Sequence, residues 1–386
     1  MLSKALKDFA HVQALAGLWT VIALILVLPA RYALPRLFEL VAAPVSLSSG
    51  PWTMIQPGIM WVNGIGAALI FLLIGLEIKR GFMEDELTGA DRLRLPALAA
   101  VGGVAIPVLA HMVLHGHEPA LARAWIIPAA SDMALGLGVL ALFGDKAPSG
   151  LRLFFLTTCL FMNAGALLVA GGIQATHMSP GTLGAAGVCL ALLLGLNLAR
   201  IGAFSVYALV GIALWSILAV SGPASALAGL FVAMAFPMQV REQAVLERTE
   251  HDLHRAVGLV LMPALAFLNA GTMGWEMAPL SPWALGIAAS LFVGKQVGIL
   301  GLCWLGTTTG LCALPPGVGW KELHGAAVLC AIGGGMSLIW SALDGALPAA
   351  ETAGAVLAAS ALAALAGFGI LRFFLGQRRN KVLPRT

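Results

Sequence analysis

Asp132 and Lys295 are the two side chains of this sequence most able to support ion chemistry. Asp132 lies in WIIPAASDMALGLGVLALFG and Lys295 in LGIAASLFVGKQVGILGLCWLG, and both stretches are apolar and long enough to cross a bilayer. A charged side chain at the centre of a membrane span costs about 2.5–3.5 kcal/mol on insertion scales, so such residues commonly mark a path for ions or protons. The pair therefore predicts an ion or proton site inside a membrane.

The composition of the chain supports a membrane setting. The 386 residues are 60% hydrophobic and only 10% charged, whereas about a quarter of a soluble domain is charged. We therefore expect residues 1–386 to form a single integral membrane domain, with a basic cytoplasmic tail over 375–386 that can touch anionic lipid. The net charge of +4 is explained by Lys and Arg in loops and indicates no nucleic acid partner.

Apolar runs of about 20 residues predict twelve transmembrane helices. If both termini are cytoplasmic, nearly all loop Lys and Arg lie inside and only Arg31, Arg36 and Arg123 lie outside, which satisfies the positive-inside rule. The expected spans are 11–30, 58–78, 95–115, 121–143, 150–173, 181–199, 203–220, 223–237, 254–273, 284–306, 325–345 and 353–374.

Two of these spans carry residues that interrupt a helix. Pro128 precedes Asp132 in the fourth span, and Gly333, Gly334 and Gly335 follow one another in the eleventh. The two spans occupy the middle of two oppositely oriented groups, spans 3–5 and 10–12, and interrupted helices in inverted repeats indicate a binding site near the bilayer midplane. The alternative is that the glycines only permit close helix packing.

The sequence shows no motif of an enzyme. It contains no nucleophile elbow, phosphate loop or metal-ligand spacing, so we expect a protein that is not an enzyme and needs no cofactor. The cysteines have no CxxC spacing and lie mostly in apolar segments, which favours small buried hydrophobes over a disulfide or metal framework. They are Cys159, Cys189, Cys303, Cys312 and Cys330.

Six blocks in order carry a family resemblance: FLLIGLEIKR at 71–80, IPAASDMALGLGVLALFG at 127–144, SGPASALAGLFVAMAFPM at 221–238, EHDLHRAVGLVLMPALAFLNAG at 250–271, GKQVGILGLCWL at 294–305 and VLCAIGGGMSL at 328–338. Through them the chain resembles the NhaA family of sodium/proton antiporters over nearly its whole length. The resemblance implies an all-α fold of twelve membrane helices in the bacterial inner membrane, with helices 4 and 11 unwound and crossing near the membrane centre. It also implies a tendency to form homodimers.

The resemblance also implies roles for individual residues. Asp132 matches the family's helix-4 aspartate, which makes it the candidate ligand for Na+ or Li+, Ser131 matches the neighbouring hydroxyl residue, and Lys295 matches the helix-10 lysine. The remaining matches are to residues associated with the cytoplasmic funnel and the response to pH, namely Glu77, Glu250, His251 and His254.

The chain departs from the family where the family's helix 5 carries two adjacent aspartates in a DDLGA stretch. The first aspartate pairs with the helix-10 lysine and the second binds sodium, but here FFLTTCLFMNAGALLVAG places Asn163-Ala164 at this point. Further losses are an acidic residue at Gly64, a histidine at Ala224 and a threonine at Gly335. Because anionic oxygens best replace the hydration of a cation in a low dielectric, we expect weaker cation binding.

These losses leave the contacts of Lys295 and the function open. Lys295 could deprotonate more readily, pair with Asp132 as a neutral plug, or donate to Asn163. Three functions follow: sodium or lithium/proton antiport with altered coupling, transport of an anion or weak acid near Lys295 and the half-helix N-termini, or a non-transporting membrane sensor or scaffold.

Overall fold

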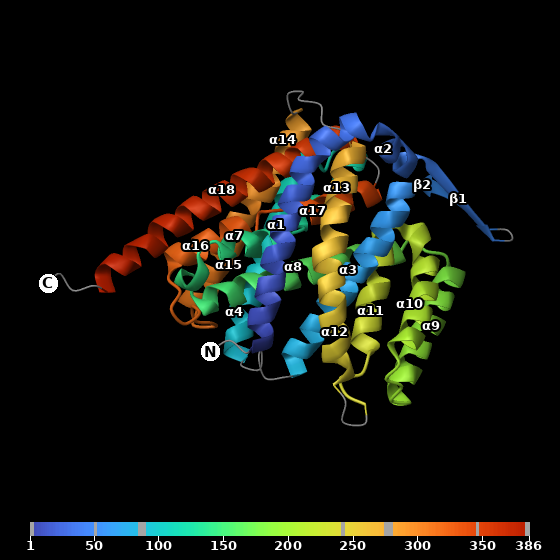
Figure 1. The fold of residues 1–386 in the computed structure, drawn as a ribbon, viewed down its shortest axis with the longest axis horizontal. Coiled ribbons are helices and arrows are strands. Elements are labelled where there is room, and N and C mark those ends of the chain that lie inside the picture. The colour runs from blue at the N-terminus through green and yellow to red at the C-terminus, as the bar shows by residue number, and fades with distance from the viewer. Residues whose placement is uncertain are drawn as a thin grey trace.

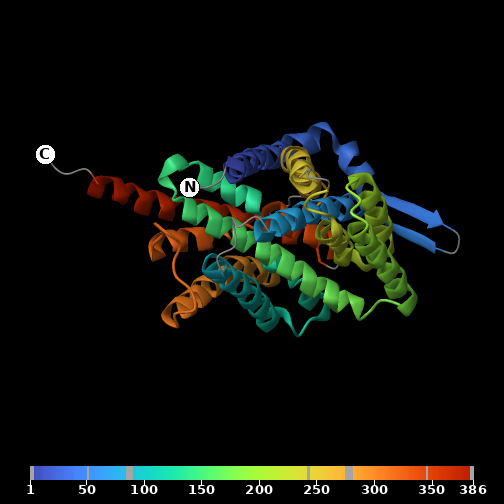
Figure 2. The same ribbon diagram turned by 90° about the horizontal axis from the view of Figure 1, so that it is seen from below.

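The computed structural model describes residues 4–49, 52–83, 90–240, 244–273, 281–344 and 347–382. These residues form an assembly of helices with a single two-stranded antiparallel hairpin at one edge. Figures 1 and 2 show that many of the helices run side by side and that α18 crosses the others obliquely. The architecture is that of a mostly helical, multi-pass membrane protein.

Ten helices or helix pairs of the described residues are long and apolar enough to span a membrane. The helices that supply them are α1 (Lys4–Ala33), α3 (Gly58–Met83), α4 (Ala90–His115), α5 to α7 (Pro119–Arg123, Ile126–Ala129, Met133–Ala141), α8 (Ser149–Ala175), α9 (Pro180–Leu198), α12 and α13 (Val245–Ala256, Met262–Met273), α14 and α15 (Pro282–Ala289, Lys295–Thr308), α16 and α17 (Trp320–Leu329, Gly334–Asp344) and α18 (Ala349–Val382).

The predicted seventh and eighth spans correspond to two shorter apolar helical segments. These are α10 (Phe204–Leu218) and the region Ala224–Ala235, which contains α11 (Leu227–Ala235) after the 3-10 segment η2 (Ala219–Ala226). Each is shorter than the length that we expect to cross a bilayer without help from neighbouring elements.

The segment between the first two predicted spans has structure that the apolar pattern did not predict. A short helix, α2 (Pro35–Ala42), is followed by the hairpin of β1 (Pro44–Ser49) and β2 (Trp52–Pro57), which pairs Pro44 with Pro57. The hairpin projects from the helices in Figure 1. At the other end of the chain, the predicted tail begins inside α18, and residues 383–386 lie outside the described residues.

Two helices are wound more loosely over five residues. The π-helical segment η3 (Val257–Leu261) joins α12 to α13, and η4 (Ser290–Gly294) joins α14 to α15 directly before Lys295. π-Helical turns occur mostly as single bulges within α-helices and frequently at functional sites. The second segment therefore draws attention to the side chain that follows it.

Glycines allow the helices around Lys295 to approach closely. A Cβ atom on Gly102 of α4 would press against the main-chain carbonyl of Gly298 in α15, and one on Gly298 would press against the carbonyl of Gly102. Small residues let helix backbones touch in lipid, where no hydrophobic force drives association. This contact fixes α15, and with it Lys295, against α4.

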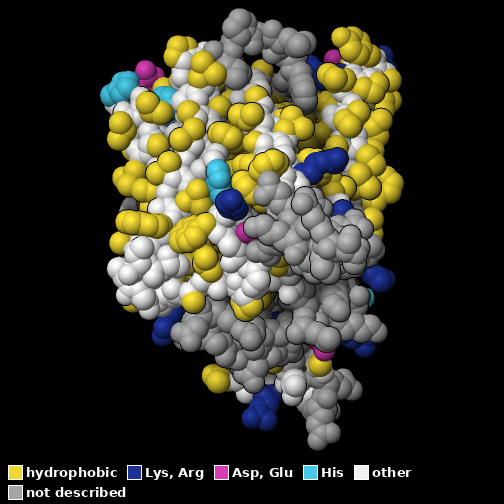
Figure 3. Space-filling view, turned by 90° about the vertical axis from the view of Figure 1, so that its left-hand side faces the viewer, with side chains coloured by type: hydrophobic (Ala, Val, Ile, Leu, Met, Phe, Trp, Pro, Cys, Tyr) yellow, Lys and Arg dark blue, Asp and Glu magenta, His cyan; other side chains and the backbone are white. Residues whose placement is uncertain are grey.

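The outer surface of the assembly is apolar, as a lipid-facing surface must be. Hydrophobic side chains cover most of the described surface on the face in Figure 3. Many large apolar side chains point outwards, among them Ile25, Val113, Leu198 and Leu365. Exposed apolar area on this scale is typical of a protein whose solvent is a bilayer.

Candidate functional site

The candidate site lies where two interrupted helices touch. The first loses its helical form at residues 130–132, between α6 and α7, and the second at residues 330–333, between α16 and α17. The amide of Asp132 donates to the carbonyl of Ile332 at 2.7 Å, and Ser131 Oγ donates to the carbonyl of Cys330 at 2.8 Å. Each interrupted helix thus provides a hydrogen-bond partner for a backbone group that has none within the other helix.

The residues expected to interrupt the helices lie at these two places. Pro128 lies in α6, two residues before the non-helical segment begins. Gly334 has a φ of +42°, a conformation in which a side chain is strained. The amides of Gly333 and Gly334 donate to Ser360 Oγ at 3.1 and 3.0 Å, so α18 supports this break from outside.

Asp132 lies at the N-termini of two half-helices. Its Oδ1 accepts from the amide of Leu135 at 3.1 Å and thereby caps α7, and its Oδ2 accepts from the amide of Gly335 at 2.8 Å in the first turn of α17. Only 1% of the residue is exposed. Because a helix N-terminus carries partial positive charge, both half-helices stabilise the negative form of this carboxyl group.

Lys295 occupies the complementary position at two half-helix C-termini. Its Nζ donates to the carbonyl of Ala130, the residue directly after α6, and to the carbonyl of Cys330 at 3.1 Å, the residue directly after α16. The side chain is wholly buried. The negative Asp132 thus contacts two positive helix N-termini, and the positive Lys295 contacts two negative helix C-termini. The helix dipoles stabilise the two charges, which do not pair with each other.

This arrangement corrects two predictions about Lys295. The ion pairs of the described residues do not include Asp132 with Lys295, so the neutral plug is not formed. The placement of Lys295 near half-helix N-termini, which motivated the anion-transport alternative, is also wrong, because its contacts are carbonyl oxygens at helix C-termini. The sequence could not show which end of each half-helix would face which charge.

Asn163 does not accept a hydrogen bond from Lys295 either, because its amide is used elsewhere. Its Nδ2 donates to the carbonyl of Ser131 at 2.8 Å, and its Oδ1 accepts from the amide of Ser131 at 3.1 Å. Asn163 therefore holds the non-helical segment of the fourth predicted span against α8.

The match of the family's aspartate pair to Asn163-Ala164 is off by one position. The Gly-Ala that ends DDLGA coincides with Gly165-Ala166, so the two aspartates match Met162 and Asn163. The side chain of Met162 is buried with its sulfur towards Gly103 of α4, next to Ile299 of α15. Met162 thus occupies the place of the lysine's acidic partner, and Asn163 that of the sodium-binding aspartate.

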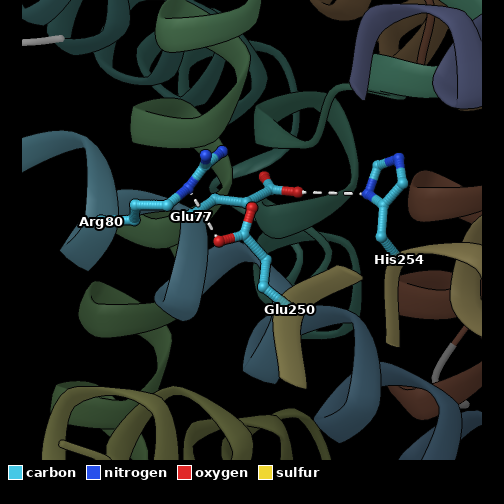
Figure 4. A network of polar contacts seen from close by, with 4 residues as sticks. All are labelled: Glu77, Arg80, Glu250 and His254. Carbon is cyan, nitrogen blue, oxygen red and sulfur yellow. Dashed lines mark ion pairs between the residues drawn. The ribbon is translucent and has the colours of Figure 1, made fainter. Parts of the chain in front are cut away.

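A second polar cluster lies between α3 and α12 and is shown in Figure 4. Arg80 Nε and Glu250 Oε2 are 2.8 Å apart, and His254 Nδ1 lies 3.6 Å from Glu77 Oε1. All four residues are buried. The structure thus brings together three of the four candidates for the pH response, whereas His251 is exposed and lies outside the cluster.

Arg80 is a member of this cluster that the sequence reading missed. It follows Glu77 by three residues in GLEIKR, a spacing that puts both side chains on one face of a helix. Its neighbour Lys79 donates to the carbonyls of Met234 at 2.7 Å and Phe236 at 2.6 Å, at the end of α11. The three-residue spacing of Glu77 and Arg80 in the sequence could therefore have identified Arg80 as a member of the cluster.

Comparison with known proteins places this chain in a family. The profile of the family described as Na+/H+ antiporter 1 matches residues 7–371. A relative from Magnetococcus marinus, named Na(+)/H(+) antiporter NhaA 2, is 37% identical over 348 residues, which cover 86% of this chain and 88% of the relative. A protein from Bordetella parapertussis named Na(+)/H(+) antiporter NhaA is 36% identical over 382 residues, which cover 95% of this chain and 96% of the relative. One of the same name from Yersinia pestis is 35% identical over 395 residues, which cover 100% of both chains. The chain is therefore a member of the Na+/H+ antiporter 1 family.

Proposed function

We propose that the protein is a secondary active antiporter that exchanges Na+ or Li+ for protons across the bacterial inner membrane, with weaker cation binding and altered coupling. Family membership supports the exchange. The observation that carries the altered coupling is Asn163, an uncharged amide that is engaged with the backbone of Ser131 where the family has a cation-binding carboxylate.

The membrane topology is part of this proposal. Twelve spans cross the bilayer when α10 and α11 are counted with the ten longer ones, and both termini are then cytoplasmic, in agreement with the positive-inside rule. The interrupted helices are the fourth span, with α6 and α7, and the eleventh, with α16 and α17, each central to one inverted repeat. The functional unit is a homodimer, as is common in the family.

The geometry suggests how one cation displaces one proton. A sodium ion needs several oxygen ligands, and besides the Asp132 carboxylate the crossing holds Ser131 Oγ and the carbonyls of Ala130 and Cys330. Lys295 already donates to both of those carbonyls. A cation that binds there competes with the ammonium group, and Lys295 can leave the carbonyls once it gives up its proton. This competition yields a one-for-one exchange.

The cluster of Glu77, Arg80, Glu250 and His254 is proposed to make the exchange sensitive to pH. Histidine changes its charge near neutral pH, and here His254 of α12 lies beside Glu77 of α3, a helix that also packs against α17. Protonation of His254 strengthens its attraction to Glu77 and tightens the contact between α3 and α12. His251, which is exposed, is not part of this response.

Proteoliposomes test the proposal directly. Proton flux is recorded with a pH dye after addition of Na+, Li+ or K+, with and without an imposed membrane potential. We expect flux with Na+ and Li+ that is lost in Asp132→Ala. Absence of cation-driven flux in the unmodified protein, together with normal cellular function of Asp132→Ala and Lys295→Ala variants, would instead establish the non-transporting sensor or scaffold.

A further inference from the structure

Two thiols meet inside the helix crossing. Cys159 lies in the middle of α8, and Cys330 is the residue directly after α16. Their Sγ atoms are 3.9 Å apart, and both residues are wholly buried. Residues 171 positions apart in the chain are thus held in sulfur–sulfur contact at the point where the helices are interrupted.

The groups around the two thiols belong to the same crossing. Ser131 Oγ lies 3.4 Å from Cys159 Sγ, and the same hydroxyl donates to the carbonyl of Cys330. Lys295 Nζ is 3.1 Å from that carbonyl oxygen, so the ammonium group contacts the residue that carries the second thiol. The thiols therefore have one hydroxyl and one ammonium group as polar neighbours.

We propose that Cys159 and Cys330 form a two-coordinate site for a soft monovalent cation of the Cu+ or Ag+ class. Sulfur ligands select soft ions such as Cu+ over hard ions such as Na+. With metal–sulfur bonds of about 2.3 Å, an ion held nearly in line between two sulfurs needs them about 4.6 Å apart. The present separation of 3.9 Å requires only a small outward movement of each side chain.

The charge balance favours a monovalent ion over a divalent one. Each thiol loses its proton when it binds the ion, so the two thiolates and one monovalent cation form a complex with a charge of −1, and two protons leave. The ammonium group of Lys295 compensates that single negative charge. A divalent ion would give a neutral complex, which gains no attraction from the ammonium group of Lys295.

The ligand count also excludes an ordinary zinc site here. Structural zinc takes four ligands and catalytic zinc takes three with one water. Within the part of the chain that the structure describes, His, Cys, Asp and Glu form no group of three that could hold a metal ion. A pair of sulfurs suits the low coordination number of Cu+ and Ag+ instead.

A bound ion would cross-link two parts of the helix crossing. It would join α8 to the end of α16 and fix Ser131 and Lys295 in their present contacts, so movement of the crossing would stop. We therefore expect low concentrations of Ag+ to inhibit any exchange by this protein. The binding itself does not rest on the proposed function and can be measured without transport.

The experiment uses the purified full-length protein with the other three thiols removed by Cys189→Ser, Cys303→Ser and Cys312→Ser. The reduced protein is incubated with silver nitrate or zinc nitrate in chloride-free buffer, desalted, and analysed for metal content and for thiols open to alkylation in denaturant. We expect one retained Ag+ for each chain, both thiols protected, and no retained Zn2+. The matched control adds Cys159→Ser and Cys330→Ser to the same background, so that it has no thiol, and it should retain at least tenfold less Ag+ after the same treatment.

Single variants separate the binding site from folding. Cys159→Ser and Cys330→Ser, each in the background without the other three thiols, should weaken Ag+ binding at least tenfold while melting as the parent does. Equal retention by these variants overturns the proposal, as does retention of Zn2+ in place of Ag+. A parent protein that forms a Cys159–Cys330 disulfide in air but retains no Ag+ when reduced overturns it too. Failure of any of these tests leaves sodium-driven flux, measured separately, unaffected.

Discussion

Asn163 and Ser131 hold each other by a reciprocal pair of hydrogen bonds, in which the asparagine amide both donates to and accepts from the backbone of the serine. The pair joins α8 to the non-helical segment that carries Asp132. A carboxylate at position 163 could accept from the Ser131 amide but could not donate to its carbonyl while ionised. Compared with a carboxylate, the asparagine provides a second hydrogen bond to Ser131 but no anionic ligand for a cation and no titratable group.

Asn163→Asp is predicted to restore cation affinity at a cost in stability. An added anionic oxygen beside Asp132 should lower the apparent KM for Na+ by at least tenfold, which corresponds to about 1.4 kcal/mol. Loss of the donor to the Ser131 carbonyl should reduce the free energy of unfolding by about 1–3 kcal/mol. Sodium-dependent proton flux and thermal melting in detergent measure the two effects. Asn163→Ala is the matched control, since it loses the same donor without adding an anionic oxygen, and an unchanged KM in Asn163→Asp would contradict the prediction.

Asp132→Asn and Asp132→Ala should both abolish cation-driven proton flux but should differ in stability. Asparagine retains an oxygen that can cap α7, whereas alanine loses the cap at a cost of about 1 kcal/mol and leaves the Gly335 amide without its acceptor. Proteoliposome flux and melting temperatures of the two variants test this. Residual flux of more than a tenth of the parent's in either variant would show that the carboxylate is not the cation ligand.

Lys295→Met should reduce the stability of the folded protein, an effect that can be measured without a transport assay. The carbonyls of Ala130 and Cys330 would lose a charged donor in a buried setting, at about 1.5–3 kcal/mol for each hydrogen bond. Thermal melting in detergent should show a clear decrease, and Lys295→Arg, which keeps a charged donor, should recover part of it. Equal melting of the methionine variant and the parent would mean that water replaces the ammonium group.

His254→Ala is predicted to change the pH dependence of exchange, while His251→Ala leaves it as it is. Only His254 contacts Glu77, and His251 is exposed on the same helix. Proton flux recorded from pH 6 to pH 9 compares the two variants with the parent. A matching shift in both variants would assign the effect to surface charge.

Arg80→Gln should reduce the free energy of unfolding by about 3–5 kcal/mol, because it removes the cation that pairs with the buried Glu250.

Gly298→Val should prevent stable assembly of α4 with α15, whereas Gly301→Val should be tolerated. A side chain at 298 would meet the backbone of Gly102, while nothing lies within 4 Å of a Cβ atom at 301. The yield of folded protein after detergent extraction and its melting temperature distinguish the two. Similar loss of both variants would mean that valine disturbs α15 itself instead of the contact.

The sequence predicted the parts of this protein that depend on local composition. Apolar runs located the helices, and the positions of Asp132 and Lys295 within them indicated the site. Pro128 and Gly334 lie at or beside the places where helical geometry ends, because both residues act on the backbone locally. These inferences need no knowledge of how the helices pack.

The contacts of the site depend on packing and were beyond the sequence. Which helix end meets Asp132 and which meets Lys295 follows from the way in which the two breaks cross. The meeting of Cys159 with Cys330 has the same origin, and spacing along the chain gave no sign of it.

The π-helical turn η4 sets the direction in which Lys295 points. Each residue of an α-helix advances the side-chain direction by about 100°, and a π-helical turn holds about one residue more than an α-helical turn. If the five residues Ser290–Gly294 were wound as an α-helix instead, Lys295 would therefore swing by roughly a quarter of a circle relative to α14. The meeting of the lysine with two carbonyl oxygens thus depends on the looser winding of one turn, and the direction of the charge is encoded in the backbone as much as in the choice of side chain.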